Sequence, residues 1–425
     1  MRELLQQVRV IDPVSATDRV ADVLIEGGTI AAIADTIPTA PDETLVYNCQ
    51  GQVLLPGLVD LYSHSGEPGF EERETLDSLS RAAAAGGFTR VAVLPDTVPA
   101  IDRPATVLWF QEQQKHLSTD GVARSRCFPW GALTVGHQGE QMTELAELAT
   151  TGIVGFADSQ PLQNLLLVQR VLEYARPLNQ PLALWAYNLD LAGKGVMREG
   201  PDALLFGLPG ISETADTSAI AALIECVAAT GTPVHFMRIA TARAVDLLKA
   251  GKDRGLPITA STTWLHLLLN TQAVGTYDPS LHLCPPLGTP ADQAALLQAV
   301  DQGIIDAIAI DHTPHTYEDK TVAFAEAPVG AIGLELALPL LWQALVASNH
   351  WSPLTLVQAL STAPARCLGQ TPPAIAPGQP TELALFAPDK TWTVEARSLQ
   401  SKATNTPWLG QEIQGKIIKS WCATA

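Results

Sequence analysis

The chain has 425 residues, 47% hydrophobic and 16% charged, so it can bury a large core and a mainly disordered state is excluded. Its net charge of −18 argues against nucleic acid or an anionic membrane as a partner. The sequence shows no signal peptide, no membrane span and no C-x-x-C pair among its six cysteines, which predicts a cytoplasmic protein.

The first fifty residues predict short strands, including a hairpin with Gly27 and Gly28 at its turn. Short apolar runs then alternate with helical segments such as 76–85 and 294–300, where apolar residues recur every three or four positions. Eight of these runs predict strands: residues 57–61, 89–94, 126–133, 152–156, 182–187, 233–239, 257–262 and 306–310. Segments 382–386 and 417–421 predict further strands near the C-terminus.

This alternation predicts an α/β fold in which residues 53–375 form a (β/α)8 TIM barrel. We expect residues 1–52 and 376–425 to pair into one small composite β-sandwich domain, with 372–380 as the linker that returns to it. Functional groups of such barrels lie at the carboxyl ends of the strands. The residues that follow each predicted strand are therefore the candidates for a site.

Residues 60–70 read DLYSHSGEPGF and residues 311–315 read DHTPH. Further motifs are PDT at 95–97, FAEAPVG at 324–330, SK at 401–402 and NTP at 405–407. With these motifs the chain resembles the dihydroorotase family of the amidohydrolase superfamily over nearly its whole length. The resemblance implies an amidohydrolase barrel, hydrolysis of a cyclic amide, and one or two zinc ions. Zinc binds imidazole and carboxylate ligands and lowers the pKa of bound water toward about 7.

The resemblance also implies six metal-ligand positions in this sequence, of which half keep a ligand. The retained positions are His64, Asp158 and Asp311. The positions that have lost a histidine are Tyr62, Trp185 and Arg238. Asp311 is also the residue that shuttles a proton in the family, so here it is interpreted as a vestigial catalytic residue.

The substrate pocket implied by the family is altered as well. Gly66 stands where the family has an arginine that clamps the substrate carboxylate, and Asp96 replaces the asparagine of a P-N-T motif. Cys284 and Gly288 replace the polar ends of an N-P-P-L-R motif, whereas His315 is retained. Loss of a buried partner of a carboxylate costs about 2–5 kcal/mol, so dihydroorotate is expected to bind poorly.

Two interpretations of the altered site remain open. In the first, the Arg238 guanidinium replaces the metal charge by pairing with Asp158 or Asp311, and Trp185 fills the vacated volume. In the second, His64, Asp158 and Asp311 hold a single zinc ion, with Tyr62 as a rare fourth ligand. The second interpretation would leave an active dihydroorotase, or a related cyclic-amide hydrolase, with an atypical mononuclear site.

We expect a catalytically inactive, dihydroorotase-like protein of pyrimidine biosynthesis, without a cofactor. The resemblance implies that it is a structural or regulatory partner of aspartate carbamoyltransferase and a homo-oligomer. A third possibility is a regulator whose pocket takes a different small ligand. The remaining histidines, and Trp264, are expected to have structural or surface roles: His116, His137, His235, His266, His282, His312 and His350.

Overall fold

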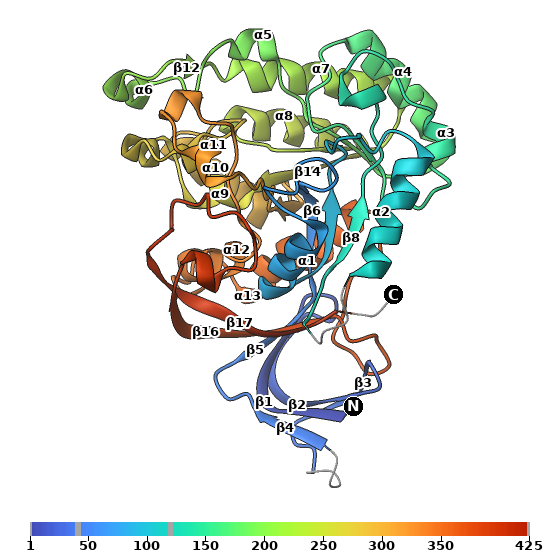
Figure 1. The fold of residues 1–425 in the computed structure, drawn as a ribbon, viewed down its shortest axis with the longest axis vertical. Coiled ribbons are helices and arrows are strands. Elements are labelled where there is room, and N and C mark those ends of the chain that lie inside the picture. The colour runs from blue at the N-terminus through green and yellow to red at the C-terminus, as the bar shows by residue number, and fades with distance from the viewer. Residues whose placement is uncertain (1, 39–43, 118–121, 423–425) are drawn as a thin grey trace.

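The computed structural model describes residues 2–38, 44–117 and 122–422. A barrel surrounded by helices forms the larger part, and a β-rich part built from both ends of the chain lies beneath it (Figure 1). Within the described ranges, no helix combines the length and the apolar character that crossing a membrane requires.

Eight parallel strands form the barrel in the part of the chain that the structure describes. They are β6 (Leu58–Ser63), β7 (Phe88–Val93), β8 (Arg126–Pro129), β9 (Phe156–Ala157), β10 (Leu182–Leu184), β13 (Val234–Phe236), β14 (Ile258–Thr263) and β15 (Ala307–Ala309). Strands β6 to β8 pair in order, as do β9, β10, β13, β14 and β15. A bridge between Gly131 and Phe156 joins β8 to β9. The barrel closes between β15 and β6, where the Asp311 N–H donates to the Tyr62 carbonyl at 3.1 Å. Each strand overlaps a predicted run, so the barrel prediction is confirmed.

Helices follow most of the barrel strands. Their bounds are α1 (Leu76–Ala85), α2 (Pro104–His116), α3 (Leu145–Leu148), α4 (Leu165–Ala175), α5 (Leu189–Ala192), α6 (Pro201–Phe206), α7 (Thr214–Thr230), α8 (Ala242–Asp253), α9 (Trp264–Leu268), α10 (Pro290–Asp301), α11 (Tyr317–Lys320), α12 (Ala337–Leu341), α13 (Pro353–Val357) and α14 (Ala363–Cys367). Helix α1 has the predicted bounds because Thr75 caps its first turn by accepting from the Ser78 N–H, and Gly86 follows its last residue. Two short strands, β11 (Met197–Arg198) and β12 (Gly210–Ile211), pair with each other after β10.

The two ends of the chain form one hydrogen-bonded sheet. Its described strands are β1 (Arg2–Asp12), β2 (Thr17–Glu26), β3 (Thr29–Ala34), β4 (Thr44–Asn48), β5 (Val53–Pro56), β16 (Leu383–Thr393) and β17 (Glu412–Trp421). The order is β17-β16-β5-β1-β2-β3, with β4 on β1. The predicted hairpin at Gly27 and Gly28 is present between β2 and β3. Strand β5 pairs with β1 and β16, so the sheet extends through Pro56, four residues beyond the predicted boundary at residue 52.

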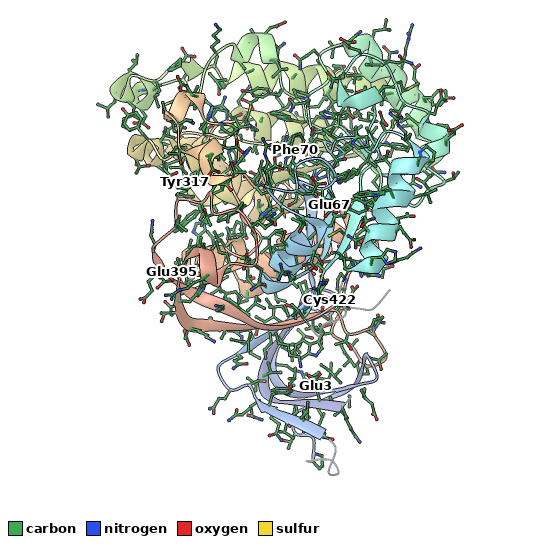
Figure 2. The ribbon with its side chains drawn as sticks, in the orientation of Figure 1. Glu3, Glu67, Phe70, Tyr317, Glu395 and Cys422 are labelled. Atoms are coloured by element: carbon green, nitrogen blue, oxygen red, sulfur yellow. The ribbon has the colours of Figure 1, made fainter. Side chains whose placement is uncertain are left out.

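The long strands β16 and β17 run beneath helices α12 and α13 (Figure 1). This arrangement leaves the opposite end of the barrel free of the β-rich part. Figure 2 places Glu67 and Phe70, in the loop after β6, on the barrel and away from Glu3 in the sheet. The carboxyl ends of the barrel strands therefore open into loops of the barrel itself.

Candidate functional site

A cavity of about 310 Å³ lies at the carboxyl ends of the barrel strands. Its lining includes His64 after β6, Asp96 after β7, Trp185 after β10, Arg238 after β13 and Asp311 after β15. Three further predicted pocket positions also line it: Gly66, Cys284 and His315. The fold thus brings together residues that are up to 251 positions apart in the chain.

Arg238 and Asp311 form a two-pronged ion pair in the centre of this site. Arg238 Nε donates to Asp311 Oδ2 at 2.8 Å, and Nη2 donates to Oδ1 at 2.7 Å. Nη1 donates to the Ser159 carbonyl at 3.2 Å, so all three nitrogens of the guanidinium have acceptors. The Arg238 side chain is 5% exposed and that of Asp311 is 17% exposed. A parallel, buried pair of this kind is among the strongest hydrogen-bonded contacts in proteins. Of the two carboxylates predicted as partners for Arg238, Asp311 is the one that binds it.

Tyr62 holds the backbone of both partners. Its hydroxyl accepts from the Arg238 N–H at 3.1 Å, and its carbonyl accepts from the Asp311 N–H at 3.1 Å. Arg238 has φ 58° and Asp311 has φ 53°, both in the left-handed region that non-glycine residues seldom adopt. Such strain costs on the order of 1–3 kcal/mol per residue and persists only where the surroundings enforce it. Tyr62 therefore supports the two residues of the ion pair through their backbone.

His64 and Asp96 form a second pair beside the first. His64 Nδ1 lies 2.5 Å from Asp96 Oδ2, and His64 Nε2 lies 3.6 Å from Asp311 Oδ1. Burial lowers the pKa of His64, but the charges of Asp96 and Asp311 outweigh burial and raise that pKa to about 9. Burial likewise opposes ionisation of Asp96 and Asp311, yet their cationic neighbours lower the pKa of both. Asp96 is thus neutralised by His64.

Asp158 is turned away from the other predicted ligands. Its Oδ1 accepts from the Leu133 N–H at 2.8 Å and the Thr134 N–H at 3.3 Å, and its Oδ2 accepts from the Thr134 hydroxyl at 2.5 Å. Burial raises the pKa of Asp158, and these hydrogen bonds offset only part of the effect. Asp158 therefore ties the end of β9 to the loop after β8 and does not line the cavity.

The residues present do not fit a zinc ion. Across the described ranges, no group of three or more histidine, cysteine, aspartate or glutamate side chains is arranged to hold a metal. His64 and Asp311 stay close, but the Arg238 guanidinium binds Asp311 and lies 3.3 Å from His64 Nε2. The three-ligand set His64, Asp158 and Asp311, with Tyr62 as a fourth ligand, is therefore not assembled. A guanidinium cation lies where zinc chemistry would need an open coordination position.

Trp185 packs against the guanidinium in the place of another family histidine. The Arg238 Cζ lies 4.6 Å from the centroid of the Trp185 ring, which is a cation–π distance. On its other side Trp185 stacks on Tyr187 with ring centroids 5.2 Å apart. The aromatic pair lies beside the ion pair, and Trp185 also lines the cavity, so it fills only part of the volume predicted for it.

The lost carboxylate clamp cannot be restored by a side chain alone. A Cβ atom at Gly66 would lie 2.2 Å from the Phe70 carbonyl oxygen and 2.4 Å from that of Glu74. At Gly288, a Cβ atom would lie 2.7 Å from the Ala240 carbonyl oxygen. The loops have closed around both glycines, so an arginine at either position requires the backbone to move.

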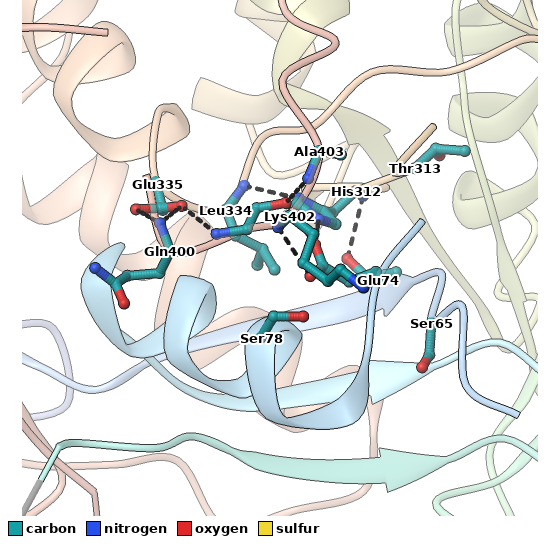
Figure 3. Close-up of polar contacts among 12 residues, drawn as sticks. Ser65, Glu74, Ser78, His312, Thr313, Leu334, Glu335, Gln400, Lys402 and Ala403 are labelled. Carbon is teal, nitrogen blue, oxygen red and sulfur yellow. Dashed lines mark hydrogen bonds and ion pairs between the residues drawn. The ribbon is translucent and has the colours of Figure 1, made fainter. Parts of the chain in front are cut away.

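The residue after Asp311 anchors the site to the C-terminal segment. His312 Nδ1 accepts from the Gly333 N–H at 3.2 Å, and His312 Nε2 lies 3.3 Å from Glu74 Oε2. Glu74 also accepts from the Lys402 N–H at 3.2 Å and from the Ser401 hydroxyl. Figure 3 shows Glu74 between His312 and this segment. His312 is therefore structural, as predicted, and Glu74, which binds His312 and both residues 401 and 402, accounts for the SK motif.

A second buried carboxylate holds the same segment. Glu335 accepts from the Gln400 N–H at 2.9 Å and from the Ser401 N–H at 3.1 Å (Figure 3). Burial raises the pKa of Glu335 to about 7. Asn405 continues the attachment, because its amide donates to the carbonyls of Thr313 and Gly330 at 2.9 and 3.2 Å. The C-terminal segment thus fixes the loop after β15.

Three residues near the site escaped the sequence reasoning. Asp60 in β6 accepts from the Ile310 N–H at 2.8 Å, and burial raises its pKa to about 7. His137 is the last residue of the 3-10 helix η1 (Val135–His137). Its electrostatic interaction with Asp96 and Asp158 acts to lower the pKa of both carboxyl groups. Arg73 lines the cavity and stacks on Phe70. A carboxylate inside an apolar strand was a readable signal for Asp60, but no local pattern marked the other two.

Four of the other histidines contact hydroxyl, carbonyl or carboxylate groups. His235 lies 2.9 Å from both Thr259 Oγ1 and Ser261 Oγ. His266 lies 2.7 Å from Thr263 Oγ1, and His282 Nδ1 donates to the Ala327 carbonyl at 2.6 Å. His116 lies 3.1 Å from Glu112 on the exposed side of α2. Trp264 is fully buried and packs on Trp408.

The sequence of the chain is similar to those of several known proteins. A family model described as "Dihydro-orotase-like" matches residues 51–244. A "Probable dihydroorotase-like protein" of Synechocystis sp. is 43% identical, over 97% of this chain and 98% of the relative. The dihydroorotase of Pelobacter propionicus is 38% identical, over 98% of this chain and 97% of the relative.

Solved structures support the fold. The dihydropyrimidinase of Brevibacillus agri superposes with a TM-score of 0.82 at 21% identity, covering 100% of this chain and 94% of the other. The L-hydantoinase of Arthrobacter aurescens superposes with a TM-score of 0.83 at 19% identity, covering 100% and 97%. These structures show that the chain shares their fold, a (β/α)8 barrel with a β-rich terminal domain.

Proposed function

Since the chain belongs to the dihydroorotase family, we propose that it serves pyrimidine biosynthesis as a noncatalytic member. In this proposal an internal ion pair replaces the metal centre, and the protein acts on the pathway through its partners. The observation that carries the proposal is the Arg238 guanidinium bound through two hydrogen bonds to Asp311.

The chemistry of Asp311 supports the absence of turnover. A residue that shuttles a proton works best when its pKa is near the operating pH. Burial disfavours the charged form of Asp311, but Arg238 and His64 lower its pKa well below the usual range. Both of its oxygens accept hydrogen bonds from Arg238, so each already has a lone pair bound to the guanidinium. Asp311 is a poor base in this setting.

The shape of the pocket supports the same proposal. The substrate named for the family carries a carboxylate, and its recognition needs a positive partner in the pocket. Gly66 leaves no space for an arginine, and the Arg238 cation is already neutralised by Asp311. A bound carboxylate would therefore lack a partner, which costs about 2–5 kcal/mol.

We further propose that the chain is a structural or regulatory partner of aspartate carbamoyltransferase, as the family resemblance implies. Adjacent leucines on α6 support a protein-binding role, because Leu204 is 86% exposed and Leu205 is 76% exposed. Exposed apolar groups of this kind are typical of surfaces that bind another protein. The leucines of α5 add to the apolar character of this end of the barrel, with Leu189 and Leu191 also exposed.

The test measures metal content, turnover and association on one preparation. Protein expressed with added zinc is expected to hold less than about 0.1 zinc per chain and to leave dihydroorotate unopened. The Pelobacter propionicus dihydroorotase, purified in parallel, is the control for metal loading and assay. One zinc per chain with dihydroorotate turnover contradicts the noncatalytic proposal. Elution with aspartate carbamoyltransferase from the same source at a raised mass is expected, and separate elution at micromolar concentrations contradicts the partnership.

A further inference from the structure

Helix α4 lies on the outside of the barrel, next to α7, and one of its sides is exposed (Figure 1). Its buried residues form the opposite stripe, which packs into the core: Leu167, Val168, Val171, Leu172 and Ala175. At 3.6 residues per turn, the exposed side is centred on six positions that continue just beyond the helix: Leu166, Gln169, Arg170, Glu173, Tyr174 and Pro177. These six residues form the α4 face.

The α4 face exposes apolar groups at both of its ends. Leu166 is 57% exposed in the first turn of the helix, and Tyr174 is 52% exposed in the last turn. Pro177 follows in the 3-10 helix η2 (Arg176–Leu178) and is exposed as well. Apolar groups gathered on one exposed side of a helix are typical of a surface that another protein covers.

The segment around the α4 face lacks the negative charge of the rest of the chain. The charged residues of 159–189 are two arginines and one glutamate, which gives this segment a net charge of +1, whereas the whole chain has −18. Two acidic proteins repel each other over most of their surfaces, and the repulsion is least where a face of this kind is presented. The α4 face therefore suits a partner that is itself acidic.

The α4 face is also complementary to itself. Its six residues are spaced symmetrically about the midpoint between Arg170 and Glu173. If two α4 helices lie antiparallel across a two-fold axis through this midpoint, each residue meets the residue at the mirror-related position. Positions 166, 170, 173 and 177 have the alternating spacing of four and three that lets two helices pack along a seam. Three kinds of contact result, each made twice: Arg170 with Glu173, Leu166 with Pro177, and Gln169 with Tyr174.

We propose that the α4 face is a self-association surface, through which two copies of this chain pair about a two-fold axis with their α4 helices antiparallel. Opposite charges meet at the centre of the contact, and apolar groups meet at its ends. A contact of this kind closes after two copies, so it gives a dimer. The inference goes beyond the proposed function, because it uses no residue of the barrel mouth or of α6, which Figure 1 places away from α4.

Charge reversal on the full chain tests the pairing. The unsubstituted protein is expected to sediment as a dimer at micromolar concentrations. Arg170→Glu places two carboxylates at each central contact and Glu173→Arg places two guanidinium groups there, so each variant is expected to raise the dissociation constant roughly 30-fold or more. An equimolar mixture of the two variants is expected to form dimers again, because both central contacts then join opposite charges.

Three results of the sedimentation experiment would overturn the inference. The first is an unsubstituted protein that is monomeric at about 100 μM, a concentration at which a dimer of micromolar affinity is mostly assembled. The second is a dimer that neither reversal weakens. The third is a mixture of the two variants that stays dissociated, since only a two-fold contact between the α4 faces predicts its recovery.

Matched variants show whether the effect belongs to α4. Arg243 and Asp246 on α8 are another exposed pair at three-residue spacing, with Nη1 and Oδ2 3.6 Å apart. Arg243→Glu is expected to keep the dimer, and a dimer lost in this variant overturns the assignment to α4. Leu166→Gln is expected to weaken the dimer roughly fivefold or more, whereas Leu204→Gln on α6 is expected to leave it unchanged. Circular dichroism is expected to show the same fold in every variant, because each substituted side chain is exposed.

Discussion

Replacement of Arg238 by methionine is expected to destabilise the protein by about 3–5 kcal/mol, because it leaves the Asp311 carboxylate buried without a counter-charge. The estimate follows from the geometry: two hydrogen bonds of 2.7 and 2.8 Å are lost, and Asp311 is only 17% exposed. Methionine keeps much of the packing volume, so the loss is mainly electrostatic. The measurement is the apparent free energy of unfolding in urea, followed by tryptophan fluorescence and by circular dichroism at pH 7.

The double variant Arg238→Met with Asp311→Asn supplies the test of cause. Removal of both charges is expected to recover most of the loss, because a neutral amide in the same place tolerates burial better than an unpaired carboxylate. The Arg238→Met single variant is also expected to gain stability relative to the unsubstituted protein as the pH falls, since its Asp311 becomes easier to protonate. A single variant that is as stable as the unsubstituted protein, or a double variant no better than the single, would refute the role of the ion pair as a replacement for metal charge.

Three further outcomes are expected. The pKa of His64 is raised from 6.5 to about 9, so the pairing of His64 stabilises the fold fully below about pH 6.5. This stabilisation should disappear as the pH rises through about 9. Unfolding curves measured from pH 6 to 10 should show the loss in the unsubstituted protein but not in His64→Ala. Gly66→Ala should destabilise by about 1–3 kcal/mol or more, because its Cβ would meet the Phe70 carbonyl at 2.2 Å, and unchanged thermal stability would contradict that tight packing. Glu74→Gln should speed hydrogen exchange of residues 400–403, since an amide cannot serve all the donors of His312 and this segment; unaltered exchange there would argue against the anchor.

The barrel was predictable because each of its strands is a short apolar run bounded by turn residues. Strands β9 and β10 are shorter than predicted, with ladders of two and three residues, Phe156–Ala157 and Leu182–Leu184. The predicted run 152–156 begins before the β9 ladder, and the predicted run 182–187 continues past Leu184 into the loop that carries Trp185. Apolar character alone does not mark where pairing starts or stops. The predicted boundary at residue 52 lies before β5, because the apolar sequence of β5 would suit a strand of either domain. In the structure β5 pairs with the terminal strands β1 and β16.

At the site, residue types were predictable but orientations were not. Arg238 was expected to pair with Asp158 or Asp311, and the sequence could not choose because both carboxylates follow barrel strands. The choice is made by Thr134, whose N–H and hydroxyl bind Asp158 from the loop after β8. Nothing near Asp158 in the sequence signals a partner 24 positions away.

Four charged side chains at the barrel mouth, two retained and two replaced, depend on one another through charge. Asp311 needs Arg238, Asp96 needs His64, and Asp158 has left the cavity for backbone donors, with a pKa that burial raises. Two cations and two carboxylates remain, so the centre is neutral without an ion from solution. Return of Arg238 to histidine would leave the Asp311 carboxylate without its guanidinium, and return of Asp96 to asparagine would leave the His64 charge without its carboxylate. For this reason the site is expected to resist stepwise restoration, and a change at Arg238 alone should lower stability without creating a metal site.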